Sequence, residues 1–157
     1  MTYEEKLYFL KNTFPSLVSK ADPSTPPVFG KMNLQQMVEH MSDSVRDAYG
    51  ITNRPLVTPE EKVPAMKAFV MSDREFKPNT KNSLMGEDPD PLRKSSLSDA
   101  LDEYNAELQN FINHFHGREH IEVVNPFFGP LNYEGWIQLL HKHAVHHCRQ
   151  FLLVNSD

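Results

Sequence analysis

The sequence has few of the features that mark secreted, membrane-spanning or nucleic-acid-binding proteins. It contains one cysteine, Cys148, among 157 residues, so no internal disulfide can form and a cytoplasmic location is expected. No apolar run approaches the length of a membrane span, and the first residues lack the uninterrupted apolar core of a signal peptide. The net charge is −5, and basic residues do not cluster with aromatics. Neither nucleic acid nor a membrane is therefore an expected partner.

Several familiar metal-site motifs are also missing. There is no Cys-x-x-Cys pair, no His-Glu-x-x-His and no Glu-x-x-His in the sequence. Their absence excludes the usual zinc-finger, metalloprotease and di-iron bundle signatures. Any metal site in this chain must use another arrangement of ligands.

Four segments do carry the periodicity of amphipathic helices, with apolar residues every three or four positions. With 39% hydrophobic residues, the chain is expected to form one all-α domain over residues 1–157. The segments are expected to begin after Thr2, Asn33, Ser96 and Asn132, and to end near Pro15, Gly50, Gly117 and Val154. Between the last two segments, residues 121–124 have the character of a short extended piece without an obvious strand partner.

The link between the second and third segments, from Gly50 to Ser95, is far longer than a normal bundle turn. Residues 58–61 form a good helix start, but Pro64 is expected to interrupt it within about a turn. The rest is rich in turn residues, notably 77–79 and 86–91. A link of this length can carry the chain from one end of a bundle to the other, which predicts that the second and third helices run parallel.

The most informative feature is a pair of histidines, His143 and His147, on the apolar stripe of the last helix. At about 100° per residue, one sector of roughly 100° contains Trp136, Leu139, Leu140, His143, His147, Gln150 and Val154. An unpaired polar ring is costly in a core, and imidazoles at i and i+4 can reach one metal ion. The alternative is a hydrogen-bonded structural pair. Gln150 shares the stripe and is either an orienting partner for a ligand or a core-edge amide.

The other histidines give weaker signals. His114, His116 and His120 are expected to be solvated residues at or beyond the end of the third helix, and His141 a surface residue. His146 lies about 80° from the stripe centre and suits a supporting residue, a proton carrier or a helix flank. His40 lies about 120° from the centre of its own helix's apolar face, so periodicity alone does not turn it inward. Cys148 is expected to be a small packing residue of the core. Trp136, Phe127 and Phe128 are expected either to lie in the core or to line a pocket.

Three motifs support His40 as a candidate metal ligand. Residues 31–41 (KMNLQQMVEHM), 126–129 (PFFG) and 142–151 (KHAVHHCRQF) resemble the DinB/YfiT-like superfamily of metalloenzymes, in a branch classed as a domain of unknown function. The resemblance implies a four-helix bundle of up-down-down-up order. It also implies that one histidine of the second helix and two of the fourth bind a divalent metal. In this sequence these are His40, His143 and His147.

The resemblance further implies a metal-dependent enzyme in which a low-molecular-weight thiol attacks an electrophile. Three imidazoles suit zinc, nickel, copper or ferrous iron, with zinc or nickel expected first. A hydrolase that activates water would use the same ligands, and a non-catalytic metal-binding or ligand-binding bundle is the third alternative. Expected partners are a small-molecule substrate and a second copy of the chain in a homodimer.

Overall fold

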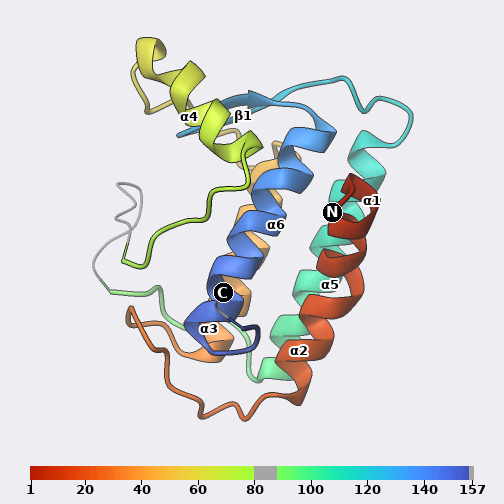
Figure 1. Cartoon of the computed structure of the whole chain (residues 1–157). Helices are drawn as coiled ribbons and strands as arrows, with labels where there is room; N and C mark the ends of the chain where they lie inside the picture. Colours follow the sequence, from red (N-terminus) through yellow and green to blue (C-terminus); the bar gives the residue numbers. More distant parts are fainter. Residues whose placement is uncertain (80–87, 156–157) are drawn as a thin grey trace.

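The computed structural model describes residues 1–79 and 88–155, and helices make up nearly all of its regular structure (Figure 1). The expectation of a helical protein is confirmed, with the addition of one small two-stranded sheet. The elements are α1 (Tyr3–Tyr8), the π-helical turn η1 (Phe9–Thr13), α2 (Phe14–Lys20), α3 (Leu34–Ala48), the 3₁₀ turn η2 (Glu60–Lys62), α4 (Val63–Met71), α5 (Leu97–Phe115), β1 (Val123–Asn125), β2 (Gly129–Leu131) and α6 (Tyr133–Gln150).

All four expected helix starts are present, and each has a side-chain cap. Thr2 and Asn33 form capping boxes with Glu5 and Gln36, in which each side chain pairs with the other residue's backbone N–H. Ser96 and Asn132 accept hydrogen bonds from backbone N–H groups three residues later. Polar residues of this kind satisfy N–H groups that the first turn of a helix leaves without intrahelical partners.

The end of α6 differs from the expectation. The helix stops at Gln150 rather than near Val154, because the chain turns back on itself directly afterwards. Leu152 adopts a left-handed conformation (φ +57°), Leu152 N–H donates to Arg149, and Leu153 N–H donates to Cys148. This is a Schellman arrangement with leucine at the position that glycine usually occupies, so the sequence carried no glycine signal for it.

Pro15 does not end the first helix, which continues to Lys20 after a widened turn. In that turn Phe14 N–H donates to the carbonyl of Phe9, and Pro15 has no N–H to donate to the carbonyl of Leu10. The buried hydroxyl of Tyr104 on α5 donates to the Leu10 carbonyl instead, at 2.7 Å. The π turn and the tyrosine together allow proline inside a buried helical segment.

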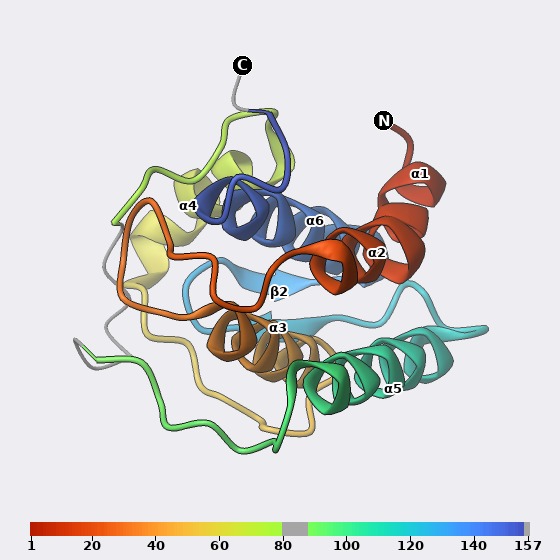
Figure 2. The same ribbon diagram turned by 90° about the horizontal axis from the view of Figure 1, so that it is seen from below.

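The long helical segments surround a common apolar interior. The chain descends through α1 and α2, ascends through α3 and again through α5, and descends through α6 (Figure 1). Seen along the helices, α4 lies outside this group, beside α6 (Figure 2). The most extensive helix–helix contact is between α3 and α5, and α3 also packs against α6. Fully buried side chains from η1, α2, α3, α5 and α6 meet in this interior. They include Leu10, Phe14, Val38, Met41, Tyr104, Leu108, Phe111, Leu140 and Ala144.

Two expectations about the links are wrong. Pro64 does not interrupt a helix but lies in the first turn of α4, where a residue without an N–H is tolerated. The extended piece near residue 123 has a partner: β1 pairs antiparallel with β2, with Val123 opposite Leu131. Of the turn-rich stretch 86–91, residues 86 and 87 lie outside the described residues. Within residues 1–79 and 88–155, no helix is long and apolar enough to cross a membrane.

Candidate metal centre

Three histidine rings from two helices meet at one point. His40 extends from α3, and His143 and His147 extend from α6 one turn apart. The Nε2 atom of His143 lies 3.0 Å from Nε2 of His40 and 2.8 Å from Nε2 of His147. The potential ligand atoms of the three residues all lie within 4.8 Å of one another. Residues more than a hundred positions apart in the sequence thus present ring nitrogens to a common centre.

Gln150 determines which nitrogen of His147 carries the proton. Its Nε2 donates to the backbone carbonyl of Phe29 at 3.0 Å, so its Oε1 is the atom that faces Nδ1 of His147, at 2.8 Å. An amide oxygen can only accept, which places the proton of His147 on Nδ1 and leaves a lone pair on Nε2. That lone pair is directed at the meeting point of the three rings.

Gly30 makes this arrangement possible. It has φ +75°, and a Cβ built on it would lie 2.8 Å from Nε2 of Gln150. A side chain at this position would therefore collide with the amide that orients His147, and the backbone conformation itself favours glycine. The loop before α3 approaches α6 closely because residue 30 has no side chain.

Protons alone cannot satisfy the three facing nitrogens. Nε2 of His147 carries no hydrogen in the tautomer set by Gln150, and Nε2 of His143 can carry only one. At most one of the two short contacts is then a well-aligned hydrogen bond, and the other holds two nitrogens together with no proton shared between them. A cation among the three nitrogens would satisfy all of them. Tetrahedral zinc, with Zn–N near 2.1 Å, separates its ligand nitrogens by about 3.4 Å, so the nitrogens that lie 2.8 and 3.0 Å apart here would move apart by about half an ångström to bind it.

Burial keeps the three rings uncharged. It lowers the pKa of His40 to about 4, and it lowers the pKa of His143 and His147 well below the usual range. The neighbouring histidines lower these pKa values further, because positive charges close together repel. At neutral pH all three imidazoles are neutral, which is the form that binds a metal ion.

Aromatic rings border the site, and two of them, Phe29 and Phe76, were not singled out by the sequence. The centre of the Phe76 ring lies 6.3 Å from that of His143 and 5.9 Å from that of His146, and its plane is nearly perpendicular to both. Phe29 lies 5.2 Å from His146. Phe128, from the PFFG motif, is buried and packs against Phe76. Phe29 and Phe76 lie in loops without periodicity, so no local pattern could have placed them here.

The remaining histidines are in different environments. His146 is half-buried between Phe29 and Phe76, and burial lowers its pKa. His116 and His120 are exposed, as expected, whereas His114 is half-buried beside Tyr49. The expectation of a surface position for His141 is wrong: its ring is half-buried 5.1 Å from Phe9, and burial lowers its pKa to about 4. Its flank of α6 faces the N-terminal helix rather than solvent.

On the other side of the site, the second half of the long link packs against α3 beside His40. The buried carboxylate of Glu39 accepts the backbone N–H of Arg93 at 2.7 Å, and the Arg93 guanidinium donates to Glu103 and Asp43. A small cavity of about 20 Å³ lies here, lined by Met32, Gln36, Glu39, His40, Asp43, Pro89, Asp90, Pro91 and Arg93. Residues 89–93 thus border His40 as residues 72–76 border His143.

Other candidate residues have structural positions. Trp136 is buried and donates its ring N–H to the carbonyl of Val123, which ties α6 to β1. Cys148 is fully buried, and burial raises its pKa to about 12, so it is an inert packing residue in this environment. Phe127 packs beside Phe128.

Comparison with known families identifies the chain. The model of the DinB superfamily matches residues 12–151, a span that contains all three converging histidines and Gln150. Comparisons with curated proteins and with solved structures returned no match. A family match over most of the sequence leads to one conclusion. The chain belongs to the DinB superfamily.

Proposed function

We propose that His40, His143 and His147 bind one divalent metal ion and that this ion is the centre of an enzyme site. The observation that carries the proposal is the convergence of three neutral Nε2 atoms, one of which has its lone pair directed inward by Gln150. Membership of the DinB superfamily supports it. Zinc and nickel are the first candidates, since both accept imidazole ligands.

We also propose that the long helical segments form the family's four-helix bundle of up-down-down-up order. The course of the chain in Figure 1 supports this order. In such a bundle the second helix lies next to the fourth for its whole length. Metal ligands can then come from both without any distortion of either helix.

The leading reaction is the transfer of a low-molecular-weight thiol to an electrophile. When bound, a divalent ion lowers the pKa of a thiol or a water molecule in its remaining position, which makes thiolate attack or hydrolysis available near neutral pH. The chain's own residues prepare the site for the ion and keep water away from it. Burial keeps the imidazoles neutral, Gln150 orients His147, and the rings of Phe29 and Phe76 exclude water from one side.

Two other functions use the same ligands. One is hydrolysis by activated water, and the other is a non-catalytic role in which the ion ties α3 to α6. A fourth protein ligand would favour the structural role, whereas an exchangeable fourth position favours catalysis. Among the described residues, the cluster of potential ligands consists of three histidines, which leaves a position for a small molecule.

Metal content tests the site directly. Protein purified without a metal column should contain about one divalent ion per chain, measured by elemental analysis. His40→Ala, His143→Ala and His147→Ala should each lose most of it, because two imidazoles rarely hold an ion against buffer competition. His146→Ala should keep it, since the ring of His146 lies outside the converging set. Equal loss in His146→Ala, or full occupancy in the three ligand variants, would show that the ligands are wrongly assigned.

The reaction is tested on the metal-loaded protein with a panel of thiols and a chloronitrobenzene electrophile, and with His143→Ala as the control. A thiol-dependent rate above the control for at least one thiol supports the transferase. Turnover of esters or amides without thiol-dependent activity favours the hydrolase. No turnover in either panel favours the non-catalytic bundle.

A further inference from the structure

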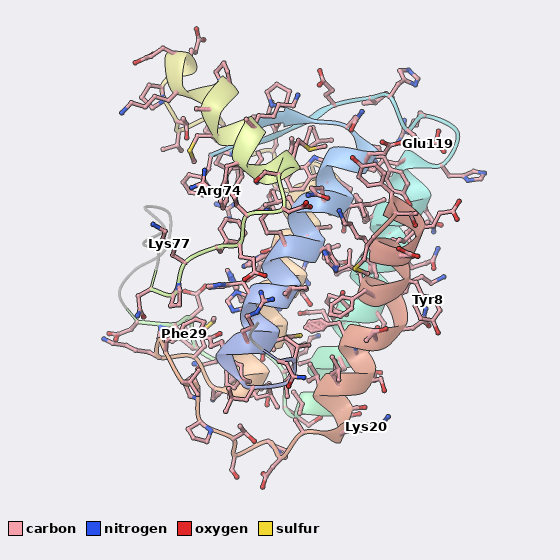
Figure 3. The ribbon with its side chains drawn as sticks, in the orientation of Figure 1. Tyr8, Lys20, Phe29, Arg74, Lys77 and Glu119 are labelled. Carbon is pink, nitrogen blue, oxygen red and sulfur yellow. The ribbon has the colours of Figure 1, made fainter. Side chains whose placement is uncertain are left out.

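The stretch of chain after α4 lies along α6 and is held there through its backbone carbonyls. Gln138 Nε2 donates to the carbonyl of Ser72 at 3.2 Å, and Lys142 Nζ donates to the same oxygen at 2.9 Å. Lys142 Nζ also donates to the carbonyl of Arg74. Figure 1 shows the chain leaving α4 and descending beside α6, and Figure 3 labels Arg74 at the start of this path.

Two further residues of α6 continue the contact. The backbone of Phe76 forms a hydrogen bond with the ring of His146, and Arg149 Nη2 pairs with the carboxylate of Glu75 at 2.7 Å. We call residues 72–76 the strap. Its partners on α6 lie at positions 138, 142, 146 and 149, so they share one face of the helix.

The contacts converge on two carbonyls of the strap. Gln138 and Lys142, which lie about one helical turn apart, both donate to the carbonyl of Ser72, and Lys142 also donates to the carbonyl of Arg74. The strap bends at residues 72 and 73, so both carbonyls reach the same ammonium. This face of α6 is therefore a binding surface that is occupied by the chain's own strap.

Lys142 is the central contact of this surface. The residue is only 9% exposed, its ammonium lies 4.8 Å from the centre of the Phe69 ring, and burial lowers its pKa. A buried ammonium requires acceptors for its hydrogens, and the two strap carbonyls supply them. The strap and Lys142 thus depend on each other.

The strap ends at the metal centre. Phe76 is its last residue, and its ring makes T-shaped contacts with the rings of His143 and His146. The same ring packs against Phe69 and Phe128. Holding the strap in place therefore holds an aromatic ring against one of the three converging histidines.

We propose that Lys142 is a positioning residue for the metal centre: it holds the strap on α6, and so keeps Phe76 over His143 as a shield against solvent on that side. The second half of this statement rests on the proposed metal binding. The first half concerns the strap alone and is tested without metal.

The strap is tested by protease cleavage after Glu75 in metal-free protein. Lys142→Met keeps the length of the side chain but removes its charge and hydrogen bonds. A glutamate-specific protease should cut this variant after Glu75 at least about fivefold faster than the unaltered protein, measured by mass spectrometry. Lys142→Arg should restore part of the protection. Lys67→Met, which removes a half-exposed lysine of α4, is the matched control and should be cut at the unaltered rate. Equal cleavage of Lys142→Met and the unaltered protein overturns the proposal.

The shield is tested by the rate at which a chelator extracts the ion. Phe76→Ala and Lys142→Met should each release metal at least about fivefold faster, and the double variant no faster than Phe76→Ala, because Lys142 acts through Phe76. Phe127→Ala is the aromatic control and should release metal at the unaltered rate. Unaltered release from Lys142→Met, or additive effects, overturns the shield.

If Lys142→Met does not fold, Gln138→Leu replaces it in both measurements, since it removes another bond to Ser72. Absence of metal from the unaltered protein contradicts the proposed function. Protease cleavage then tests only whether Lys142 holds the strap on α6.

Discussion

At the scale of single residues, Gln150 connects a loop backbone to the imidazole of His147. One end of its amide donates to the Phe29 carbonyl, and the other accepts from Nδ1 of His147. Removing the amide leaves the ring free to rotate or to change tautomer, although the ligand itself remains.

We therefore expect Gln150→Leu to weaken metal affinity by about 10- to 100-fold without changing which residues bind. Competition with a fluorescent chelator measures the dissociation constant. Gln109→Leu is the matched control, because it removes an exposed amide of α5, and it should leave the metal affinity unaltered. The same affinity in Gln150→Leu would mean that the amide has no orienting role.

The site residues differ in how far the sequence predicted them. His143, His147 and Gln150 lie on one stripe of one helix, so the helical period was enough to group them. His40 was indicated by the family resemblance and not by periodicity. The physical reason is that α3 packs chiefly on α5, so its apolar stripe points there, while its flank carries His40 to α6. A residue that faces a second neighbour falls outside a pattern set by the first.

At the scale of elements, the helix starts were predictable and several other features were not. Caps such as Asn33 and Asn132 act on N–H groups within three residues, so a short stretch of sequence contains the whole interaction. The pairing of β1 with β2 involves a strand of three residues with glycine and proline, which has no strand pattern of its own. The helix after Pro64 was missed because proline suits a first turn as well as a break.

The π turn before Pro15 depends on a partner from α5. We expect Tyr104→Phe to lower the free energy of unfolding by about 1–3 kcal/mol, because the buried carbonyl of Leu10 loses its donor while the ring packing remains. Urea denaturation measures the change.

Tyr8→Phe is the control for this substitution, since Tyr8 is 64% exposed on the neighbouring turn. It should change the free energy of unfolding by less than about 0.5 kcal/mol. Equal stability of Tyr104→Phe and the unaltered protein would mean that water or a shifted backbone satisfies the Leu10 carbonyl.

At the scale of the whole molecule, the large apolar core stands apart from the three histidines. Chelator-treated protein should therefore keep its helical circular dichroism and melt at a lower temperature than the loaded protein. Metal-free protein should also lose stability in acid. The pKa of His40 and of His141 is lowered to about 4, and burial lowers the pKa values of His143 and His147 well below the usual range.

The direction of this change in stability follows from proton uptake by the unfolded chain. Unfolded histidines titrate near 6.5, so between about pH 6.5 and 4 the unfolded chain binds protons that the folded chain does not. The free energy of unfolding should fall over that range, by up to about 1.4 kcal/mol per pH unit for each such histidine. Urea denaturation at pH 7.5, 6 and 5 measures this, with the exposed His120→Ala as the control. A free energy that is constant from pH 7.5 to 5 would contradict the burial of neutral rings.

The contact between His40 and His143 also bears on how the chain reaches its native state. The two residues are 103 positions apart, whereas His143 and His147 are separated by a single helical turn. The local pair can meet as soon as its helix forms, but the third ring arrives only after a loop of about a hundred residues has closed, which is entropically costly. An ion that binds only after all three rings have met stabilises the native state and not the states before this closure, so its loss should accelerate unfolding more than it slows folding. An ion at this point would accordingly act on the lifetime of the native molecule, as a late-closing link between the two halves of the sequence.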